Sequence, residues 1–161
     1  MKRLLLIFIF IPMLGVTQSV DNSIEWLDLS EAERLSADSN KNMLLFFYRE
    51  NCDYCEKMKK QTLSEPSVIK LINDNFFPVM LDGKSKEPII YNNKEYINDK
   101  PNIQDEPYFH NLYKELVEME DGNYYWPTIV IINGDHKKII QGQGFWPKEQ
   151  TLRNLTYILS K

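Results

Sequence analysis

The sequence is poor in cysteine: its 161 residues contain two, Cys52 and Cys55, with Asp53 and Tyr54 between them. Two cysteines are too few for the disulfide framework of a small secreted scaffold. A C-x-x-C pair also closes a very short loop, which restricts the unfolded chain little and therefore contributes little as a structural staple. A redox pair and part of a metal site are the two other interpretations.

Histidine is equally scarce, with His110 and His136 as the two examples. A structural metal site usually takes four ligands, of which the cysteines would supply two. Neither histidine stands at a recognisable ligand spacing from the cysteines. We therefore predict no metal site and no cofactor, and we expect both histidines to be packed or solvated.

Blocks of basic residues are also missing, and the formal net charge is -4. The short runs of lysine at 57–60 and 137–138 lie beside an acid or a predicted turn, which is typical of a solvated face. A nucleic-acid partner requires a basic stripe for the phosphates. We expect no nucleic-acid partner for this chain.

The longest hydrophobic run, from Leu4 to Leu14, follows the basic residues Lys2 and Arg3. The run is about half of the ~20 residues that span a bilayer as a helix. A basic start, a short apolar run and small residues after it are the layout of a secretory signal peptide. We predict that residues 1–19 are removed and that residues 20–161 act in the periplasm or outside the cell, with no stable membrane span after removal of the leader.

The chain as a whole has the length and composition of one globular domain, with 43% hydrophobic and 26% charged residues. Bounded apolar runs predict strands at 43–48, 76–82, 126–133 and 137–144, and two short runs about an Asn-Asn turn predict a hairpin at 89–97. Helical spacing predicts helices at 30–39, after Cys55, after Ser64, at 108–120 and at 145–159. This order predicts an α/β fold with a mixed sheet.

Several helix details are predicted from local signals. Ser30 and Glu33 have the spacing of a capping box, and Ser64 is the expected N-cap of the helix that contains Pro66 in its first turn. Two helices are assigned an inward face by their spacing. The residues expected to face inward are Phe109, Leu112, Leu116 and Met119 in one helix, and Leu152, Leu155, Ile158 and Leu159 in the last one.

The position of the cysteines favours redox chemistry. Cys52 follows a predicted strand at the start of a predicted helix, where free backbone N–H groups lower the pKa of a thiol. Cys55 lies one helical turn further, where its thiol can attack a mixed disulfide on Cys52 and release the product. Acids at Glu50, Asp53 and Glu56 oppose the thiolate, so no extreme lowering of the Cys52 pKa is expected.

Three stretches together resemble a known family: "LLFFYRENCDYCEKM", "EPSVIKLINDNFFPVMLD" and "WPTIVIIN". They are similar to the thioredoxin-like superfamily, in particular to exported thioredoxin-like thiol-disulfide oxidoreductases with a C-x-x-C motif. The resemblance covers most of residues 25–161 and is weakest at 83–125. It implies a thioredoxin-like fold, with a central mixed sheet flanked by helices and an insert at about 83–125 before the strand that a cis-proline opens.

The resemblance also implies roles for particular residues. Cys52 is the expected nucleophile and Cys55 the resolving thiol of exchange with protein thiols and disulfides, and a redox partner protein would recycle the pair. Pro127 is the expected cis-proline, the one residue type for which a cis bond costs little. It would turn the Trp126 backbone toward an extended peptide, so Trp126, Pro127 and Thr128 are predicted to bind substrate.

The sequence departs from the family at Phe46. Thioredoxins have a buried acid six residues before the first cysteine, and a buried carboxylate can take the proton from the resolving thiol. Phenylalanine at this position predicts that fast thioredoxin-like reduction is absent.

A second hypothesis is a binding or assembly module without catalysis, because a fold does not fix a function. Its contact surface would be the insert with its tyrosines, namely Tyr91, Tyr96, Tyr108, Tyr113, Tyr124 and Tyr125.

Overall fold

The computed structural model describes residues 22–99 and 108–160. The predicted leader lies outside these described residues, as does the segment 100–107. The helices are α1 Leu29–Ala37, α2 Asp53–Gln61, α3 Pro66–Asn75, α4 Asn111–Leu116 and α5 Lys148–Leu159. The strands are β1 Asn42–Tyr48, β2 Phe76–Asp82, β3 Ile89–Tyr91, β4 Lys94–Tyr96, β5 Thr128–Ile132 and β6 Lys138–Gln143.

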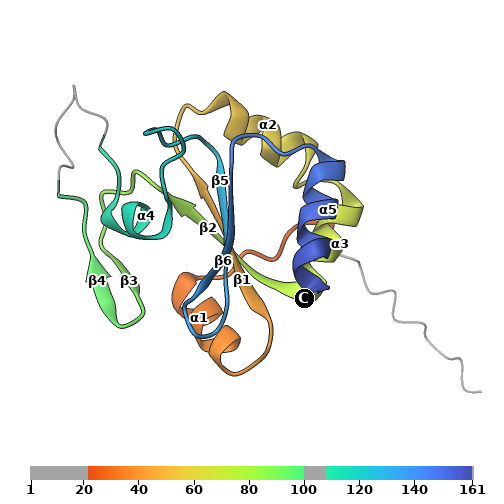
Figure 1. Cartoon of the computed structure of the whole chain (residues 1–161), viewed down its shortest axis with the longest axis horizontal. Helices are drawn as coiled ribbons and strands as arrows, with labels where there is room; N and C mark the ends of the chain where they lie inside the picture. The colour runs from red at the N-terminus through yellow and green to blue at the C-terminus, as the bar shows by residue number, and fades with distance from the viewer. Residues whose placement is uncertain (1–21, 100–107, 161) are drawn as a thin grey trace, which may run out of the picture.

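The central sheet has four strands in the order β2-β1-β5-β6 (Figure 1). Strands β1 and β2 are parallel, whereas β5 runs antiparallel to both β1 and β6. The sheet is therefore mixed, as predicted. Strand β1 is buried from Met43 to Phe47 because it lies inside the sheet and side chains cover both of its faces.

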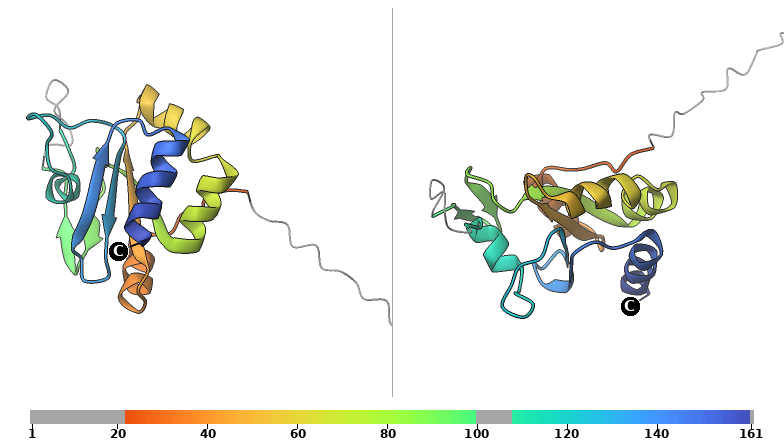
Figure 2. Two further views of the ribbon diagram at one scale, coloured as in Figure 1. Left: turned by 45° about the vertical axis from the view of Figure 1, so that its right-hand side comes forward. Right: turned by 90° about the horizontal axis from the view of Figure 1, so that it is seen from above.

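The two faces of the sheet carry different layers (Figure 2). Side chains such as Phe46 point to one face, where they meet α2, α3 and α5. The neighbouring Phe47 points to the other face, where α1, the β3–β4 hairpin and α4 pack. Alternation of side chains along β1 thus divides the core into two clusters on either side of one sheet.

The segment between β2 and β5 contains the predicted hairpin. Strands β3 and β4 pair antiparallel, and the turn residues Asn92 and Asn93 have φ of 49° and 56°. Asparagine tolerates this left-handed conformation, which a tight two-residue hairpin turn requires. Tyr91 and Tyr96 at the ends of the strands are buried in the core, so the hairpin packs onto the central domain.

Two predicted N-caps are wrong. Helix α1 begins after Asp28, and Glu33 is not part of a capping box, because its Oε1 accepts a hydrogen bond from the Asn92 N–H at 2.7 Å. Helix α3 begins after Glu65, while the Ser64 hydroxyl donates to the Lys60 carbonyl at 2.6 Å. The Glu33 side chain is engaged by a partner distant in sequence, and the Ser64 hydroxyl by the preceding turn of the chain.

Helix α4 is shorter than the predicted helix at 108–120. Phe109 precedes the helix but still packs against the core, as predicted. Met119 lies beyond the end of the helix with 56% of its surface exposed, so the predicted inward face is wrong at this residue. The chain leaves the helix at Val117, which is extended and buried. Next to it, the Gln141 side chain binds both the N–H and the carbonyl of Glu118, at 2.9 Å each.

The last helix is confirmed, with one correction to its inward face. Leu155 and Ile158 are buried in α5, and Leu152 packs against the core from a half-buried position. Leu159 is instead 41% exposed, and Thr151 takes a buried place in this face.

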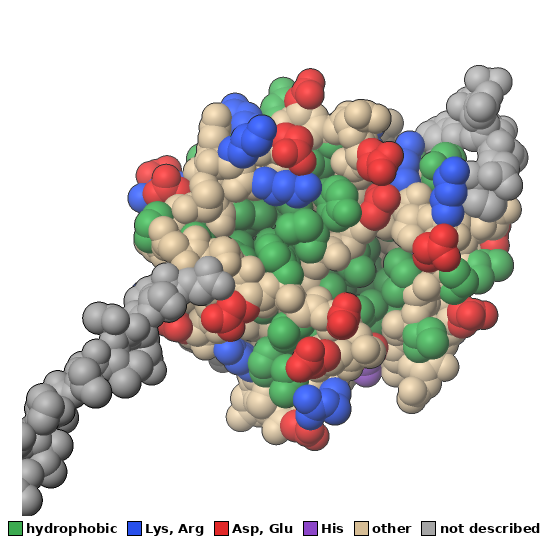
Figure 3. Space-filling model, turned by 180° about the vertical axis from the view of Figure 1, so that it is seen from behind, with side chains coloured by type: hydrophobic (Ala, Val, Ile, Leu, Met, Phe, Trp, Pro, Cys, Tyr) green, Lys and Arg blue, Asp and Glu red, His purple; other side chains and the backbone are tan. Residues whose placement is uncertain are grey.

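The surface in Figure 3 shows hydrophobic side chains in the middle of one face, with acidic and basic side chains interspersed around them. None of the helices in the described part of the chain combines the length and the apolar character of a membrane span.

Candidate active site

Cys52 lies four residues beyond the end of β1 and is the N-cap of α2. The turn between strand and helix includes Asn51 with φ of 51°. Cys52 itself is extended, and its Sγ accepts a hydrogen bond from the Cys55 N–H at 3.1 Å. The sulfur therefore occupies the place where an N-cap side chain normally meets the free donors of a helix, as the sequence predicted.

Cys52 and Cys55 form a disulfide, with their Cα atoms 5.2 Å apart. Cys52 is 5% exposed and Cys55 is 1% exposed. Both cysteines are therefore buried, and Cys52 is the less buried of the two.

Charges of both signs surround the pair. Asp53 and Glu56 occupy the first turn of α2, and Glu56 forms an ion pair with Lys59 at 3.1 Å. Lys59 also lies over the Tyr48 ring, 4.2 Å from its centroid. The first turn is therefore acidic at the position where the helix N-terminus favours negative charge on sulfur.

The Trp126–Pro127 peptide bond is cis. Strand β5 starts at the next residue and pairs antiparallel with β1, so that Thr128 lies opposite Phe47. The beginning of β5 and the end of β1 therefore lie side by side at one end of the sheet. Cys52 follows β1 at this same end. Among the described residues, no hydrogen bond engages the Trp126 N–H or carbonyl.

The side chains of the three predicted substrate-binding residues pack against, or hydrogen-bond to, other residues of the protein. The Trp126 ring stacks on Tyr113 with centroids 4.4 Å apart, and Pro127 is buried. Thr128 is fully buried, and its hydroxyl donates to the Tyr125 carbonyl at 2.8 Å. What this loop can offer to a ligand is its backbone at Trp126, and substrate binding by these residues stays a prediction.

Phe46 is fully buried in the core next to Met58 of α2. Its ring lies 6.1 Å from that of Trp26, so the position is occupied by an apolar cluster. Among the described residues, no contact makes Glu50, just beyond β1, or Asp82, opposite Tyr48 at the end of β2, a substitute for the missing carboxylate. Glu50 is exposed, and Asp82 accepts a hydrogen bond from the Lys84 N–H at 2.9 Å.

The two histidines have local partners. His110 is buried and caps α4, where its Nδ1 accepts from the Leu112 N–H and its Nε2 lies 3.1 Å from the Glu87 carbonyl. Burial lowers the pKa of His110. His136 lies in the β5–β6 turn, 3.6 Å from a Glu33 oxygen. Residues 22–99 and 108–160 contain no cluster of three or more possible metal ligands.

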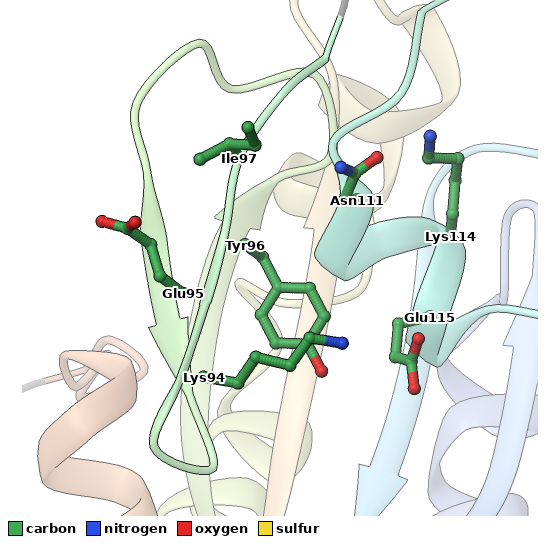
Figure 4. A pocket seen from close by; sticks show the side chains of 7 residues that line it. All are labelled: Lys94, Glu95, Tyr96, Ile97, Asn111, Lys114 and Glu115. Atoms are coloured by element: carbon green, nitrogen blue, oxygen red, sulfur yellow. The ribbon is translucent and has the colours of Figure 1, made fainter.

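A separate hollow of about 350 Å³ lies between the hairpin and α4 (Figure 4). The Tyr96 ring lies beside Lys94, whose Nζ is 4.5 Å from the ring centroid. Lys114 and Glu115 of α4 line the opposite side. Because the hollow contains neither cysteine nor any residue of the cis-proline loop, it does not belong to the disulfide site.

Sequence reasoning named Tyr113 only for a contact surface of the insert and missed its place in the core, where it is fully buried and contacts both Trp126 and Thr128. The signal was its spacing of four residues from Phe109, with which its ring also stacks. The interpretation of 108–120 as one helix assigned the inward face to Leu112 and Leu116 and left Tyr113 out.

A mixed sheet, a disulfide at the start of the helix that follows its central strand and a cis-proline at the same edge define a protein of the thioredoxin fold. The family model described as "Thioredoxin-like domain" matches residues 29–159, and the chain belongs to this family.

Solved structures share the fold at low identity. A thioredoxin from Thermus thermophilus matches with a TM-score of 0.60 and 18% identity, over 85% of this chain and 88% of that one. A disulphide isomerase from Xylella fastidiosa Temecula1 matches with a TM-score of 0.55 and 17% identity, over 81% and 87% of the two chains. At these identities, the likeness shows the shared fold.

Two relatives by sequence are uncharacterized proteins. One from Caenorhabditis elegans is 25% identical over 133 residues, which are 82% of this chain and 16% of that protein. One from Archaeoglobus fulgidus is 30% identical over 73 residues, or 44% of this chain and 58% of that protein. The chain thus matches less than two thirds of the length of either relative.

Proposed function

We propose that this protein is a thiol-disulfide oxidoreductase that exchanges disulfides with protein substrates through Cys52 and Cys55. The observation that carries the proposal is the disulfide between these cysteines at the N-terminus of α2. Neighbours of the same fold include proteins named thioredoxin, DsbH oxidoreductase and disulphide isomerase, which supports this chemistry.

The reaction is a pair of thiol-disulfide exchanges. In the reducing direction, the Cys52 thiolate attacks one sulfur of a substrate disulfide, and the other substrate sulfur leaves as a thiolate. The Cys55 thiolate then attacks the Cys52 sulfur, so that the second substrate thiolate leaves and the Cys52–Cys55 disulfide forms. Two electrons pass from the pair to the substrate, and the reverse sequence oxidises a substrate dithiol.

The assignment of the nucleophile rests on position. Cys52 is the more exposed of the two cysteines and stands at the helix terminus, where unpaired N–H groups favour a thiolate. Cys55 is buried one turn further along, within reach of the mixed disulfide.

The Trp126 backbone is the proposed docking element for the substrate. Its N–H and carbonyl have no hydrogen bond within the described residues, and it lies at the edge of the sheet from which β1 leads to Cys52. An extended substrate segment pairs naturally with such a backbone, as in sheet-edge recognition.

We also propose that the exchange takes place outside the cytoplasm. The basis is the sequence pattern of residues 1–19, so residues 20–161 would be the mature thioredoxin-like domain, with residues 83–125 as its insert. In that compartment a redox partner protein would restore the pair after each cycle. Mass spectrometry of the protein isolated from its host tests this, because a chain that still begins at Met1 would contradict export.

The proposed activity is tested by the Cys52→Ser variant in an insulin-reduction assay with dithiothreitol as the reductant. We expect the catalysed rate to fall to the uncatalysed background, because a serine hydroxyl at this position cannot form the mixed disulfide. Ser30→Ala, far from the cysteines in sequence and exposed, is the matched control and should keep the wild-type rate. Equal rates for Cys52→Ser and the wild type would refute the proposal.

The alternative of a binding module is weakened by the fate of its tyrosines. Tyr91, Tyr96 and Tyr113 are buried, so they pack the segment onto the core instead of presenting a contact surface. Full biological activity of a variant with both cysteines changed to serine would favour the alternative.

A further inference from the structure

Four aromatic rings form a cluster beside the cis-proline loop, and we define this aromatic cluster as Phe109, Tyr113, Tyr124 and Trp126. Tyr113 is at its centre: its ring stacks on Trp126 at 4.4 Å with an interplanar angle of 11°, and on Phe109 at 5.9 Å. The Tyr124 ring lies 5.1 Å from that of Tyr113. Ring contacts with Tyr113 and Phe109 therefore hold the Trp126 side chain against the preceding part of the chain.

The Tyr113 hydroxyl also reaches the residue after the cis-proline. Its oxygen lies 3.1 Å from the Thr128 hydroxyl, which in turn donates its hydrogen to the Tyr125 carbonyl at 2.8 Å. Because the threonine hydroxyl has a single hydrogen, Tyr113 must be the donor to Thr128. A directed chain of hydrogen bonds therefore runs from Tyr113 through Thr128 to Tyr125.

This chain of hydrogen bonds is buried, and its hydroxyl groups stay protonated over the physiological pH range. Both Tyr113 and Thr128 are fully buried. Burial raises the pKa of Tyr113 to about 12, so the hydroxyl stays a donor at neutral pH. Loss of the hydrogen-bond partner costs more free energy for a buried hydroxyl than for an exposed one, and this cost keeps the hydrogen bonds in their observed arrangement.

The same loop is anchored at its two sides by the neighbouring strand. The Tyr125 N–H donates to the Gln143 side chain at 2.9 Å, and the Gly144 N–H donates to the Pro127 carbonyl at 2.8 Å. Of the peptide groups from Tyr125 to Pro127, those of Trp126 keep their N–H and carbonyl without a partner among the described residues. The anchors hold the flanking groups and leave the central one available.

We propose that Tyr113 is a positioning residue that orients the Trp126 backbone toward protein substrates, through its ring contact with Trp126 and its hydrogen bond to Thr128. This rests on the proposed thiol-disulfide exchange and goes beyond it, because it assigns to α4, in the segment between β2 and β5, a role in substrate recognition. Tyr113 itself does not touch the reacting sulfurs.

The test compares two substrates of different size with pre-reduced protein. Insulin needs the docking backbone, whereas 5,5′-dithiobis(2-nitrobenzoate) is a small disulfide that needs only access to Cys52. The variants are Tyr113→Phe and Thr128→Val, which break the chain at its two hydroxyls. Tyr124→Phe is the matched control, because it removes a hydroxyl from the same aromatic cluster that takes no part in the chain.

For Tyr113→Phe and Thr128→Val, we expect the second-order rate constant with insulin to fall about fivefold, the factor that corresponds to one net hydrogen bond. The rate with the small disulfide should stay within twofold, and Tyr124→Phe should match the wild type with both substrates. An insulin rate of Tyr113→Phe within twofold of wild type overturns the inference, as does an equal loss with both substrates. A wild type inactive with both substrates overturns the proposed function and this inference together.

Discussion

At the scale of single residues, Phe46 is an apolar group at the position where the resemblance to thioredoxins implies a buried acid. Its ring is fully buried between β1 and α2, in contact with the cluster that includes Met58 and Trp26. An apolar group cannot accept a proton from Cys55, so in the proposed exchange this proton would pass to water or to another base. This is a physical reason to expect slower exchange than a buried carboxylate would allow.

The same residue stabilises the fold. We expect Phe46→Ala to lower the free energy of unfolding by about 3 to 5 kcal/mol, because a large buried ring is removed and a cavity remains. Urea denaturation followed by circular dichroism measures the change. Phe46→Leu, which keeps most of the apolar volume, is the control and should lose clearly less. A loss below about 1 kcal/mol for Phe46→Ala would show that the site collapses around the smaller side chain.

At the scale of elements, helix α4 depends on its histidine cap. The His110 Nδ1 accepts the Leu112 N–H, and its Nε2 faces the Glu87 carbonyl, so this ring is neutral with its proton on Nε2. Protonation of Nδ1 would remove the acceptor of the cap. Burial also disfavours the charged ring, and it lowers the pKa of His110 from the ordinary 6.5.

This geometry predicts a pH dependence of stability. Because the folded pKa of His110 lies below the unfolded value of 6.5, the unfolded chain binds the proton more readily. The stabilisation that neutral His110 gives to the folded state is therefore fully present above pH 6.5, and it is lost as the pH falls from 6.5 through the folded pKa. We expect the free energy of unfolding to decrease between pH 7.5 and 5.5, measured by urea denaturation at each pH.

The control for this prediction uses both histidines. His110→Asn keeps a side chain that can cap a helix and has no proton to gain, so the decrease should become smaller. His136→Asn removes the other histidine, leaves the α4 cap in place and should keep the decrease. An equal pH dependence in His110→Asn and the wild type would contradict the assignment.

At the scale of the whole molecule, the disulfide is a reactive group on a fold that does not depend on it. The bridge closes a loop between residues three apart in sequence, whereas the core is built from two apolar clusters on both sides of the sheet. By lowering the entropy of the unfolded chain, a disulfide across so short a loop stabilises the folded state by about 2 kcal/mol at most.

We therefore expect the reduced protein to stay folded. Urea denaturation with and without dithiothreitol should give free energies of unfolding that differ by no more than about 2 kcal/mol, with the same far-ultraviolet circular dichroism. The variant with both cysteines changed to serine serves as the control without a disulfide. Unfolding of the native protein on reduction would mark the bridge as a structural staple.

The sheet and the position of the cysteines could be predicted from local sequence, because each depends on short patterns. The apolar run at 43–48 predicts a strand buried on both faces, and the C-x-x-C that follows falls at a helix start in the structure. Strand β2 has the predicted bounds, and the cis bond before Pro127 agrees with the resemblance to thioredoxin-like proteins. The strands and the helix start require only neighbours along the chain, whereas the cis bond was implied by the resemblance.

The partner of Glu33, the end of α4 and the surroundings of Trp126 could not be predicted, because they depend on residues far away in sequence. Glu33 binds the hairpin turn instead of capping its own helix, and Gln141 holds the chain beyond α4. The contacts of Tyr113 with Trp126 and Thr128 require the antiparallel placement of β5 beside β1.

The sequence by itself determined a redox-type cysteine pair at a strand-to-helix junction, since that takes a short local pattern. Only the tertiary structure decided how the Trp126 backbone is held, because long-range packing and burial select its partners.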